Sequence, residues 1–202
     1  MIKLLKLFCV FLLVSASTSC AKKYVEELKK PSEPIADASK SVVVISKDEV
    51  ILYEFDKEFS KNFKDKKEFS EYYTNNFDKQ LTVNNLFKEV ISSEGKYDIE
   101  SIFSNNKVDL IISIEDFKIA AYFESSQNNS YAVNLGNSYK KKSSVKTRIK
   151  VYDKVSKKAF AEFYVIGESD YSESDYKKIV ERATEKSIEN TIEYLKTGKI
   201  KF

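Results

Sequence analysis

The sequence predicts an α+β domain in which helices cover one face of a mostly antiparallel sheet and a long amphipathic helix ends the chain. Apolar residues alternate with polar ones along 117–123 and 145–151, which is the pattern of strands that bury one face. Aromatic residues between positions 55 and 81 recur every three or four residues, which is helical spacing. Several strand patterns follow one another through short polar turns, and strands joined as hairpins are antiparallel neighbours.

The N-terminal third is expected to contain two strands and two helical stretches. Val42-Val43-Val44-Ile45 is a β-branched run typical of a buried strand, and a second strand is expected over 49–55 after a turn at Lys47-Asp48. Two sets of apolar residues indicate the helical stretches, namely Phe55, Phe59 and Phe63, and then Phe69, Tyr72, Tyr73, Phe77 and Leu81. Such an aromatic stripe could bind a ligand, but its usual role is to pack a helix on a sheet, and we expect that role here.

The middle of the chain alternates short elements. A short strand is expected over 86–91 and a short helix over 98–104. The run 108–114 is nearly continuous in apolar residues, which is typical of a central strand covered on both faces. The next strand is expected over 117–124, and a further short strand over 131–135 lies between polar loops.

The last third contains the clearest hairpin and the clearest helix. Strand 145–151 is followed by a turn over 153–158 and by a second strand over 159–167. Ser172 and Asp175 resemble the capping box that starts a helix, and Gly198 is expected to end that helix. Its apolar stripe consists of Tyr176, Ile179, Val180, Ala183, Ile188, Ile192 and Leu195.

The first 20 residues have the parts of an export signal. Lys3 and Lys6 precede an apolar run over 7–14, small residues fill 15–19, and Cys20 follows. The run is too short to span a bilayer, which needs about 20 apolar residues. This arrangement resembles the signal peptide of a bacterial lipoprotein, although Ser17 stands where that family usually has Leu.

The lipoprotein resemblance implies that residues 1–19 are removed and that the Cys20 thiol is diacylated, with palmitate-type chains, at the new N-terminus. The alternative is an ordinary signal peptide cut near Ala16 or Ser19. Cys9, the only other cysteine, lies inside the apolar run, so the mature chain has no second cysteine for a disulfide. The resemblance also implies an address in the bacterial cell envelope, and Ala21 after the cysteine favours the outer membrane.

The rest of the chain divides into a tether and one domain. Residues 20–40 contain Pro31 and Pro34 among polar residues with little apolar periodicity, so we expect a lipidated N-terminus followed by a flexible tether. Residues 41–202 are expected to form a single globular α+β domain, because they are long enough to bury one core and show no internal repeat.

Composition excludes several classes of function. The chain has no histidine, which removes histidine-dependent nucleophiles and the usual imidazole metal ligands. Its four glycines are scattered singly, so no glycine-rich loop is available to hold a nucleotide phosphate. We therefore expect no metal and no cofactor. The net charge of +3 is spread over mixed Lys, Glu and Asp residues, and nucleic acid is not expected as a partner.

Two groups of residues are candidate sites. The densest basic patch comprises Lys140, Lys141, Lys142, Lys146, Arg148 and Lys150, which could meet anionic headgroups or acidic glycan. Its simpler interpretation is a solvated loop followed by the wet face of an antiparallel strand. Asp109, Glu115, Asp116 and Glu124 could supply the carboxylate pair of a glycoside hydrolase. Their simpler interpretation is solvation at strand ends.

Three elements occur in a familiar order, namely the apolar strand 108–114, the segment 147–159 and the late helix 183–195. That order resembles the superfamily of small periplasmic lipoproteins that includes the curli assembly channel and the penicillin-binding-protein activator. The turn at Ser156-Lys157-Lys158 lacks the glycine usual in that group. The resemblance implies a lipid-anchored, non-enzymatic domain that binds or assembles an envelope protein partner, with the membrane contacted through the N-terminal lipid.

Two other functions remain open on the sequence. A carboxylate-dependent hydrolase of cell-wall glycan would bring two acids together in a cleft and would raise the pKa of one of them by burial. A structural surface lipoprotein would use its tether and its charged surface and would need no pocket.

Overall fold

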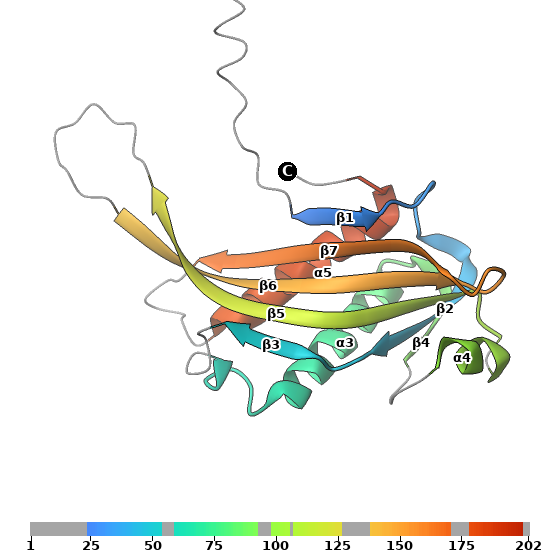
Figure 1. Cartoon of the computed structure of the whole chain (residues 1–202), viewed down its shortest axis with the longest axis horizontal. Coiled ribbons are helices and arrows are strands. Elements are labelled where there is room, and N and C mark those ends of the chain that lie inside the picture. Colours follow the sequence, from blue (N-terminus) through green and yellow to red (C-terminus); the bar gives the residue numbers. More distant parts are fainter. Residues whose placement is uncertain are drawn as a thin grey trace, which may run out of the picture.

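The structure is a computed structural model that describes residues 24–53, 59–92, 98–105, 107–126, 138–170 and 178–199. These residues form one sheet and three helices (Figure 1). The strands are β1 (Val25–Lys29), β2 (Asp37–Ser46), β3 (Val50–Tyr53), β4 (Phe87–Ser92), β5 (Leu110–Ser126), β6 (Ser138–Asp153) and β7 (Ala159–Asp170). The helices are α3 (Lys66–Val83), α4 (Ile99–Asn105) and α5 (Ile179–Thr197). No helix in this part of the chain is long and apolar enough to cross a membrane.

The sheet is mixed, so the prediction of a mostly antiparallel sheet was wrong, although the α+β class holds. Its strand order is β1-β7-β6-β5-β2-β4, and β3 pairs with β5 off this path. The pairs β1–β7, β7–β6 and β6–β5 are antiparallel, whereas β2 is parallel to both β4 and β5, and β3 is parallel to β5. The physical reason is the crossover connection: α3 lies between β3 and β4 along the chain and α4 between β4 and β5, and a helical crossover joins parallel strands.

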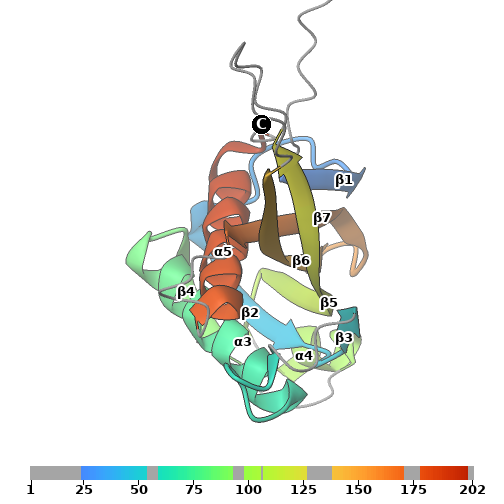
Figure 2. The same cartoon turned by 90° about the vertical axis from the view of Figure 1, so that its left-hand side faces the viewer.

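Helices also cover both faces of one half of the sheet. Helices α3 and α5 lie on one face, and α4 lies on the opposite face of β2 and β5 (Figure 2). On the α4 side, Ile102 and Phe103 pack against Val43, Ile45 and Ile111. The prediction that helices cover a single face was therefore wrong, whereas the prediction that strand 108–114 is central and covered on both sides is confirmed.

A break between β2 and β3 lies opposite an irregularity in β5. Strands β2 and β3 pair one after the other with the same edge of β5. Strand β5 is one long strand where the sequence indicated two. The Lys47 amide donates to the carbonyl of Ile114 at 2.9 Å, and the Phe117 amide donates to the carbonyl of Glu49 at 2.8 Å. The register of β5 against β6 shifts between Ile114 and Asp116, as a β-bulge does, so Glu115 is the extra residue.

The core on the α3 and α5 side is rich in aromatic rings. Phe69, Tyr73 and Phe77 of α3 are fully buried, and Phe117 of β5 meets the ring of Phe69 edge-on at 5.2 Å. The aromatic stripe of α3 therefore packs on the sheet, as the sequence predicted. Helix α5 ends at Gly198, whose φ of 61° is the left-handed cap expected there.

Helix α5 approaches the sheet most closely at Gly167 of β7. A Cβ at this position would lie 2.0 Å from the carbonyl oxygen of Ala183 and 2.1 Å from the amide nitrogen of Ser187. Beside this contact, the side-chain amide of Asn190 donates to the backbone carbonyl of Ile166 at 2.8 Å. The hydroxyls of Thr147 and Ser187 share a hydrogen bond at 3.2 Å. The backbone of α5 thus rests directly on β7, which only glycine permits.

The N-terminal segment differs from the flexible tether expected over 20–40. Val25–Lys29 forms β1, which pairs with β7 and buries Val25. Ile35 is also buried, and the amides of Ile35 and Ala36 donate to the carbonyl of Leu195 at 3.1 and 2.9 Å. The described fold therefore begins well before residue 41. The expected strand 131–135 and the capping pair Ser172 and Asp175 lie outside the described residues.

Candidate functional site

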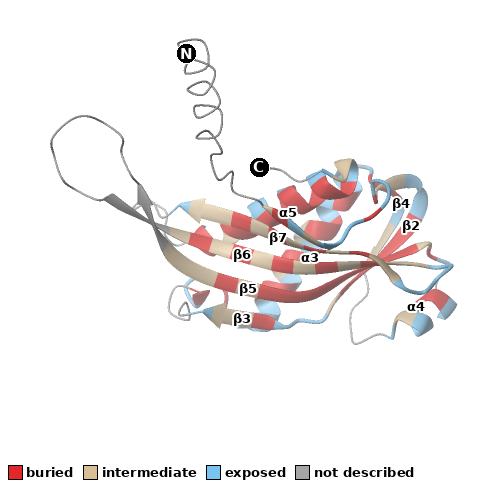
Figure 3. Cartoon of the chain, turned by 45° about the horizontal axis from the view of Figure 1, so that its top comes forward, coloured by how far each residue is buried: buried red, intermediate tan, exposed pale blue. Residues whose placement is uncertain are grey.

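The face of the sheet that α3 and α5 leave uncovered carries most of the candidate residues, and we call it the open face. Along β6, Val145, Thr147, Ile149 and Val151 are buried toward the helices. The alternate residues, including Lys146, Arg148 and Lys150, are half-buried on the other side (Figure 3). This confirms the two-residue alternation that the sequence predicts for the hairpin.

The structure brings together only part of the predicted basic patch. Lys142, Lys146, Arg148 and Lys150 share the open side of β6. Lys140 and Lys141 belong to β6 by backbone pairing with Glu124 and Phe123, and their side chains lie outside the described part. Cys20 also lies outside the described residues.

The cations on the open side of β6 are opposed by carboxylates on the neighbouring strands. Lys142 Nζ lies 3.5 Å from a carboxylate oxygen of Asp170, and Lys146 Nζ lies 2.7 Å from one of Glu26. The patch that looks basic in the sequence of one strand is therefore of mixed sign in the sheet. A patch of one sign raises the local concentration of anions, whereas this surface suits a partner that carries both charges.

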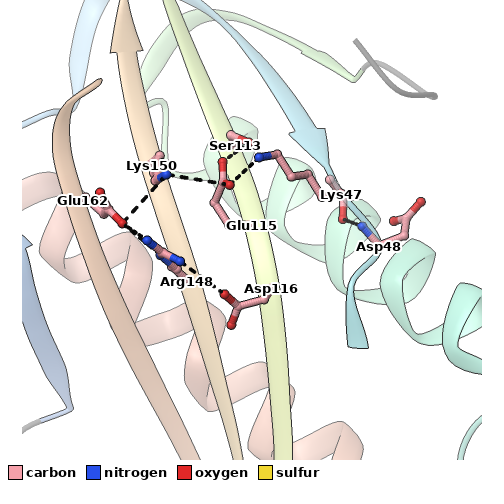
Figure 4. Close-up of polar contacts among 9 residues, drawn as sticks. Lys47, Asp48, Ser113, Glu115, Asp116, Arg148, Lys150 and Glu162 are labelled. Atoms are coloured by element: carbon pink, nitrogen blue, oxygen red, sulfur yellow. Dashed lines mark hydrogen bonds and ion pairs between the residues drawn. The ribbon is translucent and has the colours of Figure 1, made fainter. Parts of the chain in front are cut away.

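Residues around the β5 bulge form a connected set of polar contacts, which we call the open-face cluster: Lys47, Ser113, Glu115, Asp116, Arg148, Lys150 and Glu162 (Figure 4). Glu115 accepts hydrogen bonds from Lys47 and, at 2.8 Å, from the Ser113 hydroxyl, and Lys150 Nζ lies 3.9 Å away. Its side chain is only 8% exposed. Buried carboxylates require such partners, so Glu115 is anchored from three sides.

Arg148 joins two acids across three strands. Its Nε donates to Glu162 on β7 at 2.9 Å, and a second guanidinium nitrogen donates to the same oxygen. This hydrogen bonding raises the pKa of Arg148 above its usual value. On the other side, its guanidinium lies 3.9 Å from a carboxylate oxygen of Asp116. Arg148 therefore links β7 to the bulge in β5.

Asp116 is the least compensated acid of the cluster. Burial raises its pKa above the usual value for Asp, and the negative charges of Glu49 and Glu115 act in the same direction, whereas Lys118 and Arg148 oppose the shift. Its Oδ1 is buried with no hydrogen-bond partner among the described residues. The β-bulge explains its position, because the extra residue brings Glu115 and Asp116 to the same face.

Tyr164 of β7 lies beside the cluster and is contacted by three cations. Lys146 Nζ lies 4.2 Å from the ring centroid, Lys118 Nζ 5.1 Å and the Arg148 guanidinium carbon 5.8 Å. These are cation–π distances, and Tyr and Arg are enriched among the residues that contribute most to binding at protein interfaces. No sequence signal marked Tyr164, because the cations around it come from two other strands, β5 and β6.

The remaining predicted carboxylates do not join the cluster. Asp109 accepts hydrogen bonds from the amide and hydroxyl of Ser41 at 2.8 and 2.9 Å, and these bonds lower its pKa. It thus ties the start of β5 to β2. The side chain of Glu124 lies outside the described part. No group of three or more His, Cys, Asp or Glu side chains within the described ranges could hold a metal ion.

A cavity of about 480 Å³ lies at another place, where the end of the β6–β7 pair meets α5. Its wall includes Tyr24, the residue before β1, together with cations from β6 and α5 and acids from β7 and α5. The sequence did not predict this cavity, because its lining comes from four separate segments of the chain.

Comparison with known proteins finds similar folds at low similarity. No protein-family model and no curated protein matches the chain. A homolog of a neuraminyllactose-binding hemagglutinin from Helicobacter pylori is 15% identical, with a TM-score of 0.49, over 83% of this chain and 88% of that chain. A PelC dodecamer chain from Paraburkholderia phytofirmans is 13% identical, with a TM-score of 0.45, over 86% and 98%.

A minor lipoprotein from Acinetobacter baumannii is also similar, at 6% identity and a TM-score of 0.44 over 81% of this chain and 98% of that chain. At these identities and TM-scores, the similarities assign neither a family nor a function to the chain.

Proposed function

We propose that this protein is a lipid-anchored component of the bacterial cell envelope whose domain binds or assembles with another envelope protein without catalysing a reaction. The observation that carries the proposal is the leader that ends at Cys20, the last of the two cysteines in the chain. An exported domain normally uses cysteines in pairs, so a single cysteine after the leader suits a lipid anchor.

The open face supports a binding role. Its charged groups are held in ion pairs across β1, β5, β6 and β7, and Tyr164 lies among three of its cations. A rigid surface of mixed charge with a central aromatic ring is suited to recognising a protein partner by charge complementarity.

The anchor is tested by cell fractionation. The full chain with Cys20→Ala should leave the membrane fraction and lose incorporation of labelled palmitate. Cys9→Ala is the matched control, because it changes the other cysteine inside the leader and should leave both properties intact. Recovery of the Cys20→Ala protein in membranes as fully as the unaltered protein would contradict the proposal.

The binding role is tested by photo-crosslinking in living cells. A crosslinker placed at Tyr164 should capture a defined envelope protein, whereas one placed at Val83, which is 65% exposed on α3, should not. Equal capture at the two positions, or none at either, would contradict recognition by the open face.

A glycan hydrolase remains the second candidate, because one observation favours it. Burial raises the pKa of Asp116, and Asp116 lies next to a second acid, Glu115. A carboxylic acid with a raised pKa beside a second carboxylate is part of the arrangement that glycoside hydrolases use. Against it, the Glu115 carboxylate is already engaged by Lys47, Ser113 and Lys150. Release of fragments from purified cell wall that is lost in Asp116→Asn would establish the hydrolase and overturn the non-enzymatic proposal.

A further inference from the structure

The chain enters the described fold next to the charged cavity. The amide of Ile166 in β7 donates to the carbonyl of Tyr24 at 2.8 Å, and β1 begins at the next residue. Tyr24 also lines the cavity at the end of the β6–β7 pair. The residue at which the chain joins the sheet is thus part of the cavity wall.

Tyr24 is the fourth residue after Cys20, with only three residues between them. Whatever conformation these residues take, the Cα atoms of Cys20 and Tyr24 lie at most about 14 Å apart, since an extended chain advances no more than about 3.6 Å per residue. If Cys20 is acylated, its acyl chains lie in the hydrocarbon layer and its backbone lies at the level of the lipid headgroups. Tyr24 and the cavity are then held within about 14 Å of the headgroup layer.

The lining of the cavity carries both charges. Its cations are Lys142 on β6 and Arg182 and Lys186 on α5. Its acids are Glu168 and Asp170 on β7, and Glu185 and Glu189 on α5. Asp170 and Glu189 are already paired with Lys142 and Lys186, and the lining has one carboxylate more than it has cations. A headgroup with only negative charge would meet this excess of carboxylates unfavourably, whereas a headgroup with a phosphate and an ammonium can be paired at both ends.

We propose that this cavity lies in the headgroup layer of the membrane that holds Cys20 and that it binds the zwitterionic headgroup of a phospholipid with a primary ammonium, such as phosphoethanolamine. The proposal deepens the proposed function and rests on the acylation of Cys20. The phosphate is placed near the cations on β6 and α5, and the ammonium near the carboxylates, to which it can donate three hydrogen bonds. A trimethylammonium headgroup carries the same charge but has no N–H to donate.

The orientation of the domain on the membrane is tested with a labelled, acylated protein in vesicles. Because acylation uses the Cys20 thiol and Cys9 leaves with the signal peptide, one introduced cysteine is the only free thiol. A fluorescent label at Lys178→Cys, which is exposed and lies one helical turn before Arg182 of the cavity wall, is compared with one at Val155→Cys, which lies in the turn at the other end of the β6–β7 pair and is 96% exposed. The two ends are roughly 30 Å apart, given about 3.3 Å per strand residue.

Lipids with a nitroxide on the headgroup should quench the label at position 178 at least about twice as strongly as the label at position 155, since only the former is held near the headgroup layer. Ten Gly/Ser residues inserted between positions 23 and 24 should keep the protein on the vesicle and remove this difference. Equal quenching at both positions in an acylated protein would overturn the inference while leaving the anchor intact. A protein that is not acylated would instead overturn the proposed function.

The headgroup preference is tested by replacing phosphatidylethanolamine with phosphatidylcholine at a constant fraction of anionic lipid. Quenching at position 178 should fall in phosphatidylcholine, and Glu185→Gln combined with Glu189→Gln in the same labelled protein should remove the dependence on lipid type. Equal quenching in the two lipids would contradict binding of a primary ammonium. The same variant in its unlabelled form should keep its far-ultraviolet circular dichroism, which separates lost binding from lost folding.

Discussion

Gly167→Ala is expected to destabilise the domain strongly. The new methyl carbon would lie 2.0 Å from the Ala183 carbonyl oxygen and 2.8 Å from the backbone carbon of Lys186, so it meets backbone and not the end of a flexible side chain. Helix α5 must retreat by roughly 1.4 Å to restore an ordinary contact, and overpacking of this kind costs about 1–3 kcal/mol. The retreat also strains the buried hydrogen bond from Asn190 to the Ile166 carbonyl, whose loss costs about 1–3 kcal/mol. We therefore expect a loss of about 2–6 kcal/mol, a large part of the stability of a single domain.

The assay is equilibrium unfolding in urea, followed by far-ultraviolet circular dichroism, on the chain without its signal peptide and with Cys20→Ala. Ser169→Ala is the matched control, because Ser169 is the next residue along β7 on the same face, and its effect should stay within about 0.5 kcal/mol. Adding Ser187→Ala to Gly167→Ala should not restore stability, since the clash involves backbone atoms. A Gly167→Ala variant with an unchanged midpoint would refute the direct contact of α5 with β7.

Three further predictions concern the open face and the turns. Glu115→Gln should lower the free energy of unfolding by about 1–2 kcal/mol, because the buried Glu115 carboxylate accepts hydrogen bonds from Lys47 and Ser113 and also lies 3.9 Å from Lys150 Nζ. Glu26→Gln, with a side chain 56% exposed, should change the free energy of unfolding by less than about 1 kcal/mol. Equal shifts of the urea midpoint in the two variants would count against the anchoring of the bulge. Burial keeps the pKa of folded Asp116 above its unfolded value of 3.8, so the favourable contribution of this group is lost as pH rises through the folded pKa. Asp116→Asn should therefore be more stable than the unaltered protein at pH 7, and this gain in the free energy of unfolding should shrink toward pH 3.8. The pKa of Asp109 is lowered instead, so Asp109→Asn should be less stable than the unaltered protein at pH 7, by an amount that shrinks as pH falls. The same change of stability with pH in both variants would refute the assignment. Lys157 has a φ of 53°, so Lys157→Gly should stabilise the turn by about 0.5 kcal/mol and Lys158→Gly should destabilise it by a similar amount, and a thermal melt that ranks the two in the opposite order would contradict the turn geometry.

The elements that the sequence predicts well are those with long, regular patterns. Helix α3 follows from the spacing of Phe69, Tyr73 and Phe77, and the β6–β7 hairpin follows from the alternation of Val145, Thr147 and Ile149. Helix α5 ends at Gly198 because glycine takes the left-handed conformation without steric cost. In each case, a local pattern and the tertiary packing require the same residues on the same face.

The direction of the strands was predicted wrongly, because two of the connections between strands contain a helix and are therefore not hairpins. The chain passes from β3 through α3 to β4, and then through α4 to β5, and each passage through a helix returns the chain to the same end of the sheet. Reading strand–helix–strand units as crossovers would have predicted the parallel pairs. The turn expected at Lys47-Asp48 separates two strands, β2 and β3, that run in the same direction along β5.

The candidate site was only partly accessible from the sequence. The alternation in β6 correctly places Lys146, Arg148 and Lys150 on one face, but one strand says nothing of the acids that oppose them. Glu115 and Asp116 reach the same face only because of a β-bulge, and strict alternation would have separated them. The tether was expected because the segment 21–40 has no periodic pattern, yet Val25 and Ile35 are buried as single anchoring residues.

The lipid anchor is tested most directly by the mass of the N-terminal peptide of the protein purified from membranes of the bacterium that makes it. This peptide should begin at Cys20 and carry a diacylglyceryl group on its thiol. Trypsin would then release it as the acylated tripeptide Cys20-Ala21-Lys22. A peptide that begins after Ala16 or Ser19 and contains an unmodified Cys20 thiol would contradict the lipid anchor.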